Sequence, residues 1–171
     1  GSVVTWGYAD YGGDSSTIAS GLTSGVSSIV SALNAFAAIK SDGSVVTWGS
    51  DSVGGDSSSV QSSLMSDVTS IIGNSAAFAA IKEDGSVVTW GHSSYGGDSS
   101  SVANNLTNIS SIVSNDYTFA AIKTDGSVVT WGNSDQGGDS SAVQSDLKTL
   151  HTYTIENNDV PNNEPTGDVL I

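Results

Sequence analysis

The chain contains no cysteine among its 171 residues. Disulfides, thiolate metal sites and cysteine nucleophiles are therefore all excluded. Arginine is absent as well, and four basic residues stand against 18 acidic ones, which gives a formal net charge of −14. Arg and Lys supply the phosphate contacts of nucleic-acid-binding proteins. This charge balance therefore excludes nucleic-acid binding through a basic face and disfavours binding to an anionic membrane surface.

Long hydrophobic runs are missing too. No apolar stretch approaches the roughly 18 residues of a membrane-spanning helix, so we expect no membrane insertion. Histidine is scarce: His92 and His151 are the only two, and they lie at unrelated places in the sequence. No nucleophile-elbow pattern accompanies them. We therefore expect a protein that is not an enzyme and has no catalytic residues and no cofactor.

What the chain does have is an internal repeat. Residues 36–49 read Phe-Ala-Ala-Ile-Lys-Ser-Asp-Gly-Ser-Val-Val-Thr-Trp-Gly, and they recur with little change at residues 78–91 and 119–132. The second half of this motif also stands at residues 1–7. Trp6, Trp48, Trp90 and Trp131 are consequently 42, 42 and 41 positions apart. A period of this size is typical of a propeller or a solenoid.

Each repeat predicts a small antiparallel sheet. Two strands are expected at a Ser-Ser-Ile-Val run and at Phe-Ala-Ala-Ile-Lys, and a third at Ser-Val-Val-Thr-Trp-Gly. Asp-Gly between the last two predicts a two-residue type I′ turn with positive φ at both positions. The Gly-Gly-Asp-Ser-Ser run after each Trp-Gly predicts a tight bend, followed by a short polar turn or loop. We expect the Trp of each repeat and Phe36, Phe78 and Phe119 to form the core between neighbouring sheets.

The last repeat is incomplete. Residues 147–155 predict a strand pair without a Trp-Gly strand, whereas residues 1–7 supply such a strand without a pair. We therefore expect an all-β propeller or partial propeller with three full blades, and a fourth completed by the N-terminal strand of the same chain or by a second chain in a ring-closing homodimer. A β-solenoid is the alternative fold. The predicted domains are residues 1–155, the repeats, and residues 156–171, a linker and the beginning of a further module.

The repeated motif resembles that of the regulator-of-chromosome-condensation (RCC1) type β-propellers, whose Leu-Lys-x-Asp-Gly-x-Val-x-x-Trp-Gly core it shares. The short period is similar to that of bacterial members, including the secreted propeller inhibitors of β-lactamases. The chain departs from the family in having Gly-Gly-Asp where Gly-Gln-Leu is usual, and about half of the usual seven blades. The resemblance implies a blade architecture and a non-catalytic binding role.

The variable positions carry the functional signal. Within nearly identical repeats, the four residues after Trp-Gly differ from one repeat to the next, and the three before the conserved strand vary as well, which marks them as positions that the fold leaves free. Tyr is favoured at interfaces because it offers a large area with a polar tip. The candidate partner-binding residues are Tyr8, Asp10, Tyr11, Asn34, Asp51, Asn74, His92, Tyr95, Tyr117 and Asp135. Drift in exposed loops would give the same variation.

These patterns predict a protein-binding or adhesion module of a larger secreted or cell-surface bacterial protein. The alternatives are a carbohydrate-binding propeller and a structural spacer in a surface fibre. Asp14, Asp56, Asp98 and Asp139 recur in every repeat, but one carboxylate per turn is too few for calcium, so we expect no metal site. Glu156, Asp159, Glu164 and Asp168 leave calcium at the linker as a further alternative.

Overall fold

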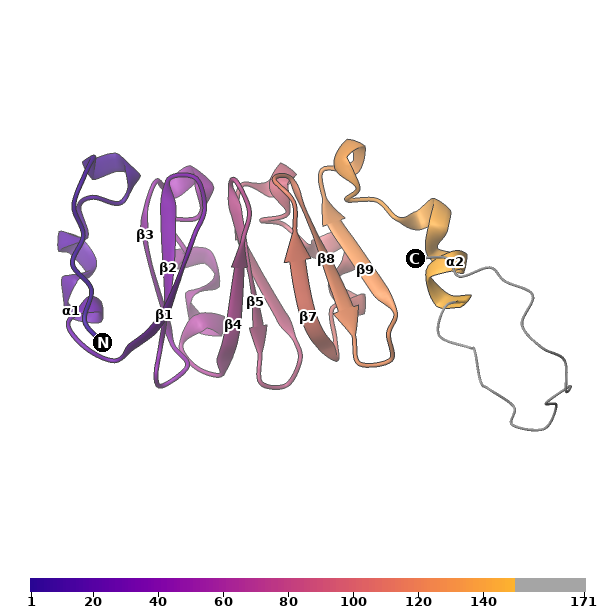
Figure 1. Ribbon diagram of the computed structural model, residues 1–171, viewed down its shortest axis with the longest axis horizontal. Coiled ribbons are helices and arrows are strands. Elements are labelled where there is room, and N and C mark those ends of the chain that lie inside the picture. The colour runs from indigo at the N-terminus through magenta and orange to yellow at the C-terminus, as the bar shows by residue number, and fades with distance from the viewer. Residues whose placement is uncertain (150–171) are drawn as a thin grey trace, which may run out of the picture.

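The computed structural model describes residues 1–149. Its nine strands form three separate antiparallel sheets, each in the order in which its strands follow along the chain (Figure 1). The sheets are β1 (Val26–Ser31), β2 (Ala35–Lys40) and β3 (Val45–Gly49); β4 (Val68–Gly73), β5 (Ala77–Lys82) and β6 (Val87–Gly91); and β7 (Ile109–Ser114), β8 (Thr118–Lys123) and β9 (Val128–Gly132). Val, Ile, Thr and aromatic residues favour these strands because their side chains pack well on a pleated surface.

Every described sheet is built within one repeat. β2 pairs with β1 on one side and with β3 on the other, and β5 and β8 do the same in their own repeats. A solenoid would instead pair strands of successive repeats, so the sheet topology excludes it. The predicted all-β fold of repeated small sheets is confirmed, and the arrangement is that of a partial β-propeller.

The turn between the second and third strands differs from the prediction. Lys40 and Ser44 face each other across it, with a 2.8 Å bond from the Lys40 amide to the Ser44 carbonyl, and the Gly43 amide donates to the Lys40 carbonyl. Gly43 has a φ of 76°, whereas Asp42 is not among the residues with positive φ. The loop therefore has three residues, a type I turn closed by a left-handed glycine. The type I′ prediction was wrong because only the last of the three positions needs positive φ.

Aspartate stabilises this turn through its side chain. Asp42 Oδ1 accepts bonds from the hydroxyl and the amide of Ser44, and Asp84 accepts the same pair from Ser86. The Ser hydroxyl, and next the Ser amide, hold the pKa of each carboxyl below its usual value. A lowered pKa in the folded state stabilises the protein above the unfolded pKa, and this contribution is lost as the pH falls through the folded pKa.

We therefore expect the melting temperature to fall as the pH is lowered from about 5 through the usual Asp pKa of about 3.9 and below. The double variant Ser44→Ala, Ser86→Ala keeps both carboxylates but loses the largest cause of the shift. Its melting temperature should depend less steeply on pH than that of the wild type. Thermal unfolding followed by circular dichroism between pH 7 and pH 3 measures both slopes, and equal slopes would contradict the assignment.

Short helical turns begin at the end of each Gly-Gly-Asp-Ser-Ser run, where a short turn or loop was predicted. They are η2 (Ser16–Ile18) with α1 (Ala19–Leu22), η4 (Ser58–Leu64), η6 (Ser100–Asn105), and η8 (Ser141–Val143) with α2 (Gln144–Thr149). Leu22, Leu64 and Leu106 are buried, and their packing against the sheets outweighs the weak helix propensity of Ser and Asn.

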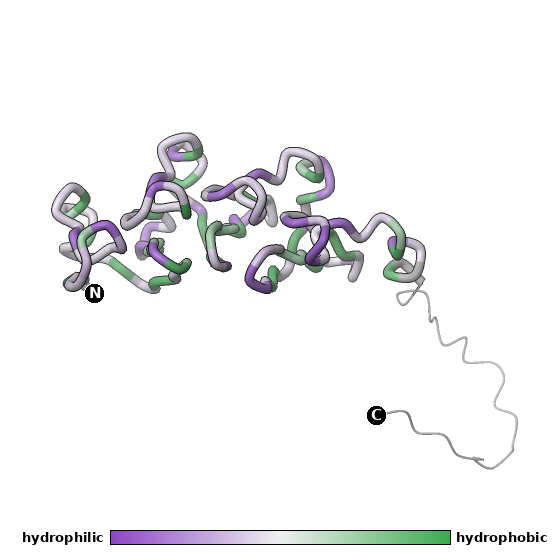
Figure 2. The backbone as a smooth tube through the Cα atoms, turned by 90° about the horizontal axis from the view of Figure 1, so that it is seen from above, coloured by the Kyte–Doolittle hydropathy of each residue, from purple (hydrophilic) through white to green (hydrophobic). Residues whose placement is uncertain are grey.

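The core lies between successive sheets. Ala35, Ala37 and Ile39 on β2 pack against Ile71 on β4 and Phe78 on β5, and β5 packs in the same way on the third sheet. The small alanines let neighbouring sheets approach closely. Figure 2, seen from above, shows the repeats following one another in a row. Each sheet therefore depends on the next one to bury its faces.

Tryptophan joins consecutive repeats. Trp90 stacks on Phe78 with ring centroids 5.2 Å apart, and its indole N–H donates to the Gly54 carbonyl of the preceding repeat at 3.1 Å. Phe36 with Trp48, and Phe119 with Trp131, repeat this stacking, and their indoles donate to Gly12 and Gly96. These residues are buried or half-buried between the sheets. Trp6 was expected in the same core, but it is 81% exposed because no described sheet precedes it.

The two ends of the described chain lie far apart. The N-terminal segment is at the indigo end of the row in Figure 1, and α2 is at the opposite end. Completion of a blade by residues 1–7 and residues 147–149 of the same chain is therefore not seen, and residues 147–149 belong to a helix, not to a strand. Residues 150–155 of the expected strand pair, and residues 156–171 of the expected linker and module, lie outside the described residues. Completion by another chain stays a prediction.

Candidate functional site

The variable positions of all repeats come together on one edge of the molecule, here called the loop edge. The third strand of each sheet ends there, and so does the first strand, because neighbouring strands are antiparallel. The loop edge is the upper edge of Figure 1. It consists of residues 8–11, 32–34, 50–53, 74–76, 92–95, 115–117 and 133–136, with the turns η1 (Ala9–Tyr11), η3 (Asp51–Val53), η5 (Ser93–Tyr95) and η7 (Ser134–Gln136).

A constant backbone frame holds these variable side chains. Each short turn ends at a left-handed glycine, such as Gly54 with a φ of 102°. In each of the three sheets, the residue after Trp-Gly also donates its amide to the neighbouring loop of the same sheet, as Ser50 does to Asn34 and His92 does to Ala76, both at 2.8 Å. These backbone contacts do not depend on the side chains that the loop edge presents, so most of these side chains can vary without loss of the fold. Asn74 and Asn115 are exceptions, because their side chains accept bonds from the backbone of their own loops.

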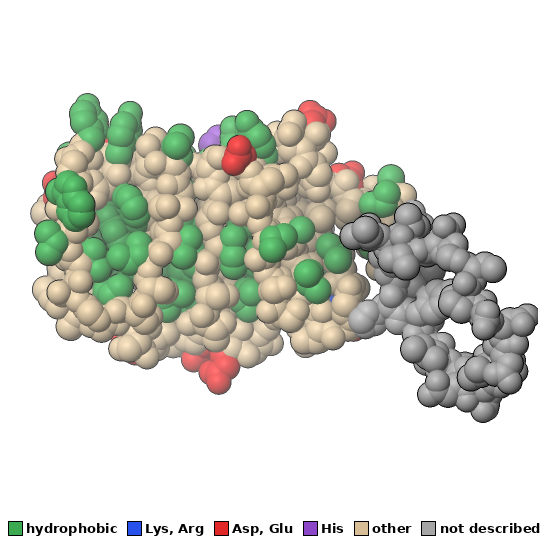
Figure 3. Space-filling model, viewed as in Figure 1, with side chains coloured by type: hydrophobic (Ala, Val, Ile, Leu, Met, Phe, Trp, Pro, Cys, Tyr) green, Lys and Arg blue, Asp and Glu red, His purple; other side chains and the backbone are tan. Residues whose placement is uncertain are grey.

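Aromatic side chains gather at two places on the loop edge. His92 and Tyr95 meet edge to face with centroids 5.0 Å apart, and Tyr95 lies 5.3 Å from Tyr117, which comes from the next repeat. Tyr8 and Tyr11 are 5.0 Å apart on the first repeat, and both are exposed. In Figure 3, hydrophobic side chains and a histidine project from this edge. The pairing of Tyr95 with Tyr117 could not be read from the sequence, since they belong to different loops.

The charge on this edge has one sign. Asp10, Asp51 and Asp135 are exposed on it, as the sequence predicted, and Asp116 joins them although it was not among the candidates. Lys40, Lys82 and Lys123 end the second strand of each sheet and so lie at the opposite edge. Among the residues that the structure describes, the loop edge therefore carries tyrosines and carboxylates without a lysine or arginine.

The two asparagine candidates differ in exposure. Asn74 is only 8% exposed, and its amide group makes three hydrogen bonds. Its Nδ2 donates to the Tyr95 carbonyl, while its Oδ1 accepts from the amides of Ala76 and Ala77. Asn74 therefore fixes the loop that carries Tyr95 and offers little surface to a partner. Asn34 is half-buried, and its carbonyl accepts the Ser50 amide.

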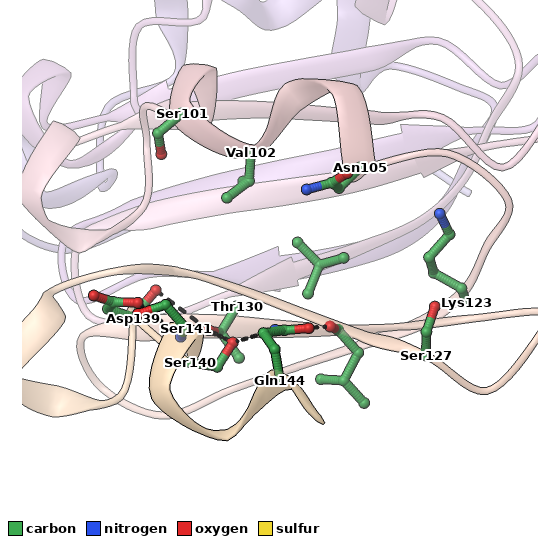
Figure 4. A pocket seen from close by; sticks show the side chains of 13 residues that line it. Ser101, Val102, Asn105, Lys123, Ser127, Thr130, Asp139, Ser140, Ser141 and Gln144 are labelled. Carbon is green, nitrogen blue, oxygen red and sulfur yellow. Dashed lines mark hydrogen bonds between the residues drawn. The ribbon is translucent and has the colours of Figure 1, made fainter. Parts of the chain in front are cut away.

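A second repeated feature, missed in the sequence, is a polar groove beside the third strand of each sheet. The largest, with a volume of about 710 Å³, is shown in Figure 4 and is lined by Thr130, Asp139, Ser140, Ser141, Gln144 and Lys123 among others. Grooves of about 400 Å³ and 410 Å³ occupy the equivalent places at Thr47 and Thr89. The lining threonine bonds to a serine in each, at 2.9 Å for Thr47 and Ser57 and at 2.8 Å for Thr130 and Ser140. The sequence signal for these grooves was the constant Gly-Gly-Asp-Ser-Ser run, which we interpreted only as a bend.

Within residues 1–149, neither the loop edge nor the polar grooves carry a set of metal ligands. In residues 1–149, no group of three His, Asp or Glu side chains is placed to hold a metal ion. His92 lies on the loop edge, whereas His151 and the acidic residues of the linker lie outside the described residues. None of the helices in the described part of the chain is both long and apolar enough to cross a membrane.

No protein family profile matches the sequence, and no curated protein matches it. Solved structures do match in part. Human WBSCR16 is 18% identical over 63% of this chain and 34% of that chain, with a TM-score of 0.42. The ectodomain of the Physcomitrella patens receptor kinase CR4 is 19% identical over 75% and 32%, with a TM-score of 0.46. A structure of Kap60 bound to yeast RCC1 (Prp20) is 19% identical over 64% and 32%, with a TM-score of 0.48.

The chain spans about a third of the length of the structures that it matches. One of these structures contains yeast RCC1, and the repeated motif at residues 36–49 resembles that of the RCC1-type propellers.

Proposed function

We propose that this chain is a non-catalytic protein-binding module that contacts its partner through the loop edge. One observation carries the proposal: a constant frame brings seven variable loops to a single edge, and two of them join His92, Tyr95 and Tyr117 into one aromatic cluster. Aromatic residues are enriched in protein interfaces and provide much of their binding energy. Four carboxylates lie along the same edge.

The charge of the edge indicates the chemistry of the partner. Asp10, Asp51, Asp116 and Asp135 would complement a surface that carries Lys or Arg, with apolar groups facing the tyrosines. Such contacts accelerate association at low ionic strength and are screened by salt. The association rate should therefore fall as salt is added.

The test is a selection of binders from a displayed library of protein fragments, followed by affinity measurements on matched variants. The double variant Tyr95→Ala, Tyr117→Ala removes the cluster and should weaken binding at least about tenfold, since truncated aromatic hot spots cost about 2 kcal/mol or more. Met65→Ala removes another exposed apolar side chain, away from the loop edge, and should leave affinity unchanged. Equal affinity of both variants for every selected binder would refute the proposal.

We also propose that the module acts outside the cell, in a secreted or surface-attached bacterial protein, as an adhesin or in a role like that of the secreted propeller inhibitors. Support comes from the net charge of −14, which suits a protein in a salty medium, and from the short repeat. Fractionation of the source cells, with detection by an antibody against residues 1–149, tests the location. Detection in the cytoplasm alone would refute it.

Carbohydrate binding is the second candidate, because the polar grooves are alike in every repeat. Repeated sugar sites need the same residues in each blade, which the loop edge lacks and the grooves have. A glycan array distinguishes the two functions. Hits lost in a Thr89→Val, Asp98→Ala variant and kept in Tyr95→Ala would favour the grooves and reverse the ranking.

A further inference from the structure

The aromatic cluster of His92, Tyr95 and Tyr117 is held in a fixed arrangement by the protein itself. Tyr95 packs against the core between the second and third sheets, and its carbonyl accepts a bond from Nδ2 of Asn74 at 2.7 Å. The Tyr117 amide donates to Oδ1 of Asn115 at 2.8 Å. A binding group that is already ordered loses little conformational entropy when a partner binds.

The two loops that carry the tyrosines are also bonded to each other. The Ser75 amide donates to the Asp116 carbonyl at 3.3 Å. Ser75 follows Asn74, which holds Tyr95, and Asp116 precedes Tyr117 in the chain. The cluster is therefore one unit built from two successive repeats, and it belongs to the second and third sheets in the middle of the described row (Figure 1).

Carboxylates accompany this cluster. Asp116 is exposed in the same loop as Tyr117, and Asp135 is exposed in η7, a turn whose Gln136 carbonyl accepts a bond from Nδ2 of Asn115 at 3.2 Å. Figure 3 shows an acidic side chain directly beside a histidine and hydrophobic side chains on this edge. The lysines that end the second strands lie at the opposite edge. An exposed aromatic surface therefore lies next to negative charge, which favours a cation that can contact both.

We propose that this cluster binds an arginine side chain of the partner protein, with the guanidinium stacked on Tyr117 and paired with the Asp116 carboxylate. The inference rests on the proposed protein-binding function and names the group that the loop edge recognises. Tyr117 is 38% exposed, so its ring is accessible to a partner. The chain itself contains no arginine that could compete for this position.

The chemistry of the two basic side chains distinguishes arginine from lysine. A guanidinium is planar and weakly hydrated, so it can stack on an aromatic ring while its N–H groups bond to a carboxylate. A lysine ammonium is a compact and strongly hydrated point charge, which gains less from the ring. Arginine should therefore bind more tightly than lysine at the same net charge.

The probe is a dye-labelled peptide, Gly-Ser-Arg-Gly-Arg-Gly-Arg-Ser-Gly, added to the full chain. Two matched peptides carry lysine or citrulline in place of every arginine, and fluorescence anisotropy gives the three dissociation constants. We expect the arginine peptide to bind at least about fivefold more tightly than the lysine peptide, as a cation–π contact at a partly exposed site allows. The citrulline peptide keeps the planar group without its charge and should bind at least about tenfold more weakly than the arginine peptide.

Matched variants assign this preference to the cluster. Tyr117→Leu keeps an apolar side chain without the aromatic face and should bring the arginine-to-lysine ratio to about one. Asp116→Asn should weaken binding of the arginine peptide at least about threefold, whereas Asp67→Asn removes the same charge from the opposite edge and should leave the ratio unchanged. The double variant Tyr8→Ala, Tyr11→Ala removes the aromatic pair of the first repeat, whose rings are 68% and 55% exposed, and should keep the ratio.

Several results would overturn the inference. They are no saturable binding of the arginine peptide, equal dissociation constants for the arginine and lysine peptides, and an arginine preference that survives Tyr117→Leu. A preference that disappears in the Tyr8→Ala, Tyr11→Ala variant would place the contact on the first repeat and overturn it as well.

Failure of this inference and failure of the proposed function are distinguishable. If the selected protein binders need Tyr95 and Tyr117 but tolerate lysine in place of each of their arginines, protein binding through the loop edge stands and the arginine contact is refuted. If no binder is selected, the protein-binding proposal fails, and the peptide comparison alone shows whether the cluster selects arginine.

Discussion

Replacing Trp90 by alanine should destabilise the protein by about 3–5 kcal/mol, whereas the same change at Trp6 should cost less than about 0.5 kcal/mol. The two residues hold the same position in the repeat. Trp90 is buried, stacks on Phe78 and donates to the Gly54 carbonyl of the repeat before it. Its removal leaves a cavity between two sheets and a carbonyl without its donor. Trp6 has neither contact among the described residues.

Urea unfolding of the two variants, followed by far-ultraviolet circular dichroism, measures both free energies. Trp90→Phe keeps an aromatic ring beside Phe78 and removes the N–H together with the volume of the second ring. It should cost about 1–3 kcal/mol, the penalty for an unsatisfied buried acceptor. Equal losses for Trp90→Ala and Trp6→Ala would show that stacking between repeats does not stabilise the array.

Gly97→Ala should be the other severe change, at about 3 kcal/mol or more, because the new methyl group would meet backbone on all sides. A Cβ at Gly97 would lie 2.4 Å from the Gly91 oxygen, 2.5 Å from the Gly91 carbonyl carbon and 2.9 Å from the His92 oxygen. Backbone atoms cannot relieve this clash by rotating about a side-chain bond, as a side chain can. The turn that carries Tyr95 and the end of β6 would have to separate.

Gly21→Ala is the matched control. Its Cβ would lie 3.0 Å from a methyl group of Val46, which is a side-chain contact, and Gly21 is in α1, where alanine is the better helix former. This variant should change stability by less than about 1 kcal/mol. Thermal unfolding of the two variants tests the pair: a difference of about 3 kcal/mol corresponds to roughly 6–12 °C in a chain of this size. Equal melting temperatures would contradict the close backbone approach.

The chain alone determined the repeat unit. The Trp-Gly spacing gave the period, and runs of the Ser-Ser-Ile-Val, Phe-Ala-Ala-Ile-Lys and Ser-Val-Val-Thr-Trp-Gly types predicted three strands in each full repeat, all of which the structure contains. Asp-Gly marked every turn, although the turn type was wrong because local sequence does not state how many residues the loop spans. The variable loops of all repeats were recognisable because comparison among the repeats separates scaffold from free positions.

The tertiary structure decided the features that depend on contact with a neighbouring repeat or loop. Identical motifs gave a buried Trp48 and an exposed Trp6, since burial needs a sheet on the other side. Asn74 was a candidate because it lies in a variable loop, but it is held inside by one hydrogen bond to the loop of Tyr95 and two to the backbone that follows it. Tertiary structure likewise decided the cluster of Tyr95 with Tyr117 and the polar grooves. Each is formed by segments more than 20 residues apart. The repeat pattern cannot indicate such contacts, because it is nearly the same in every repeat.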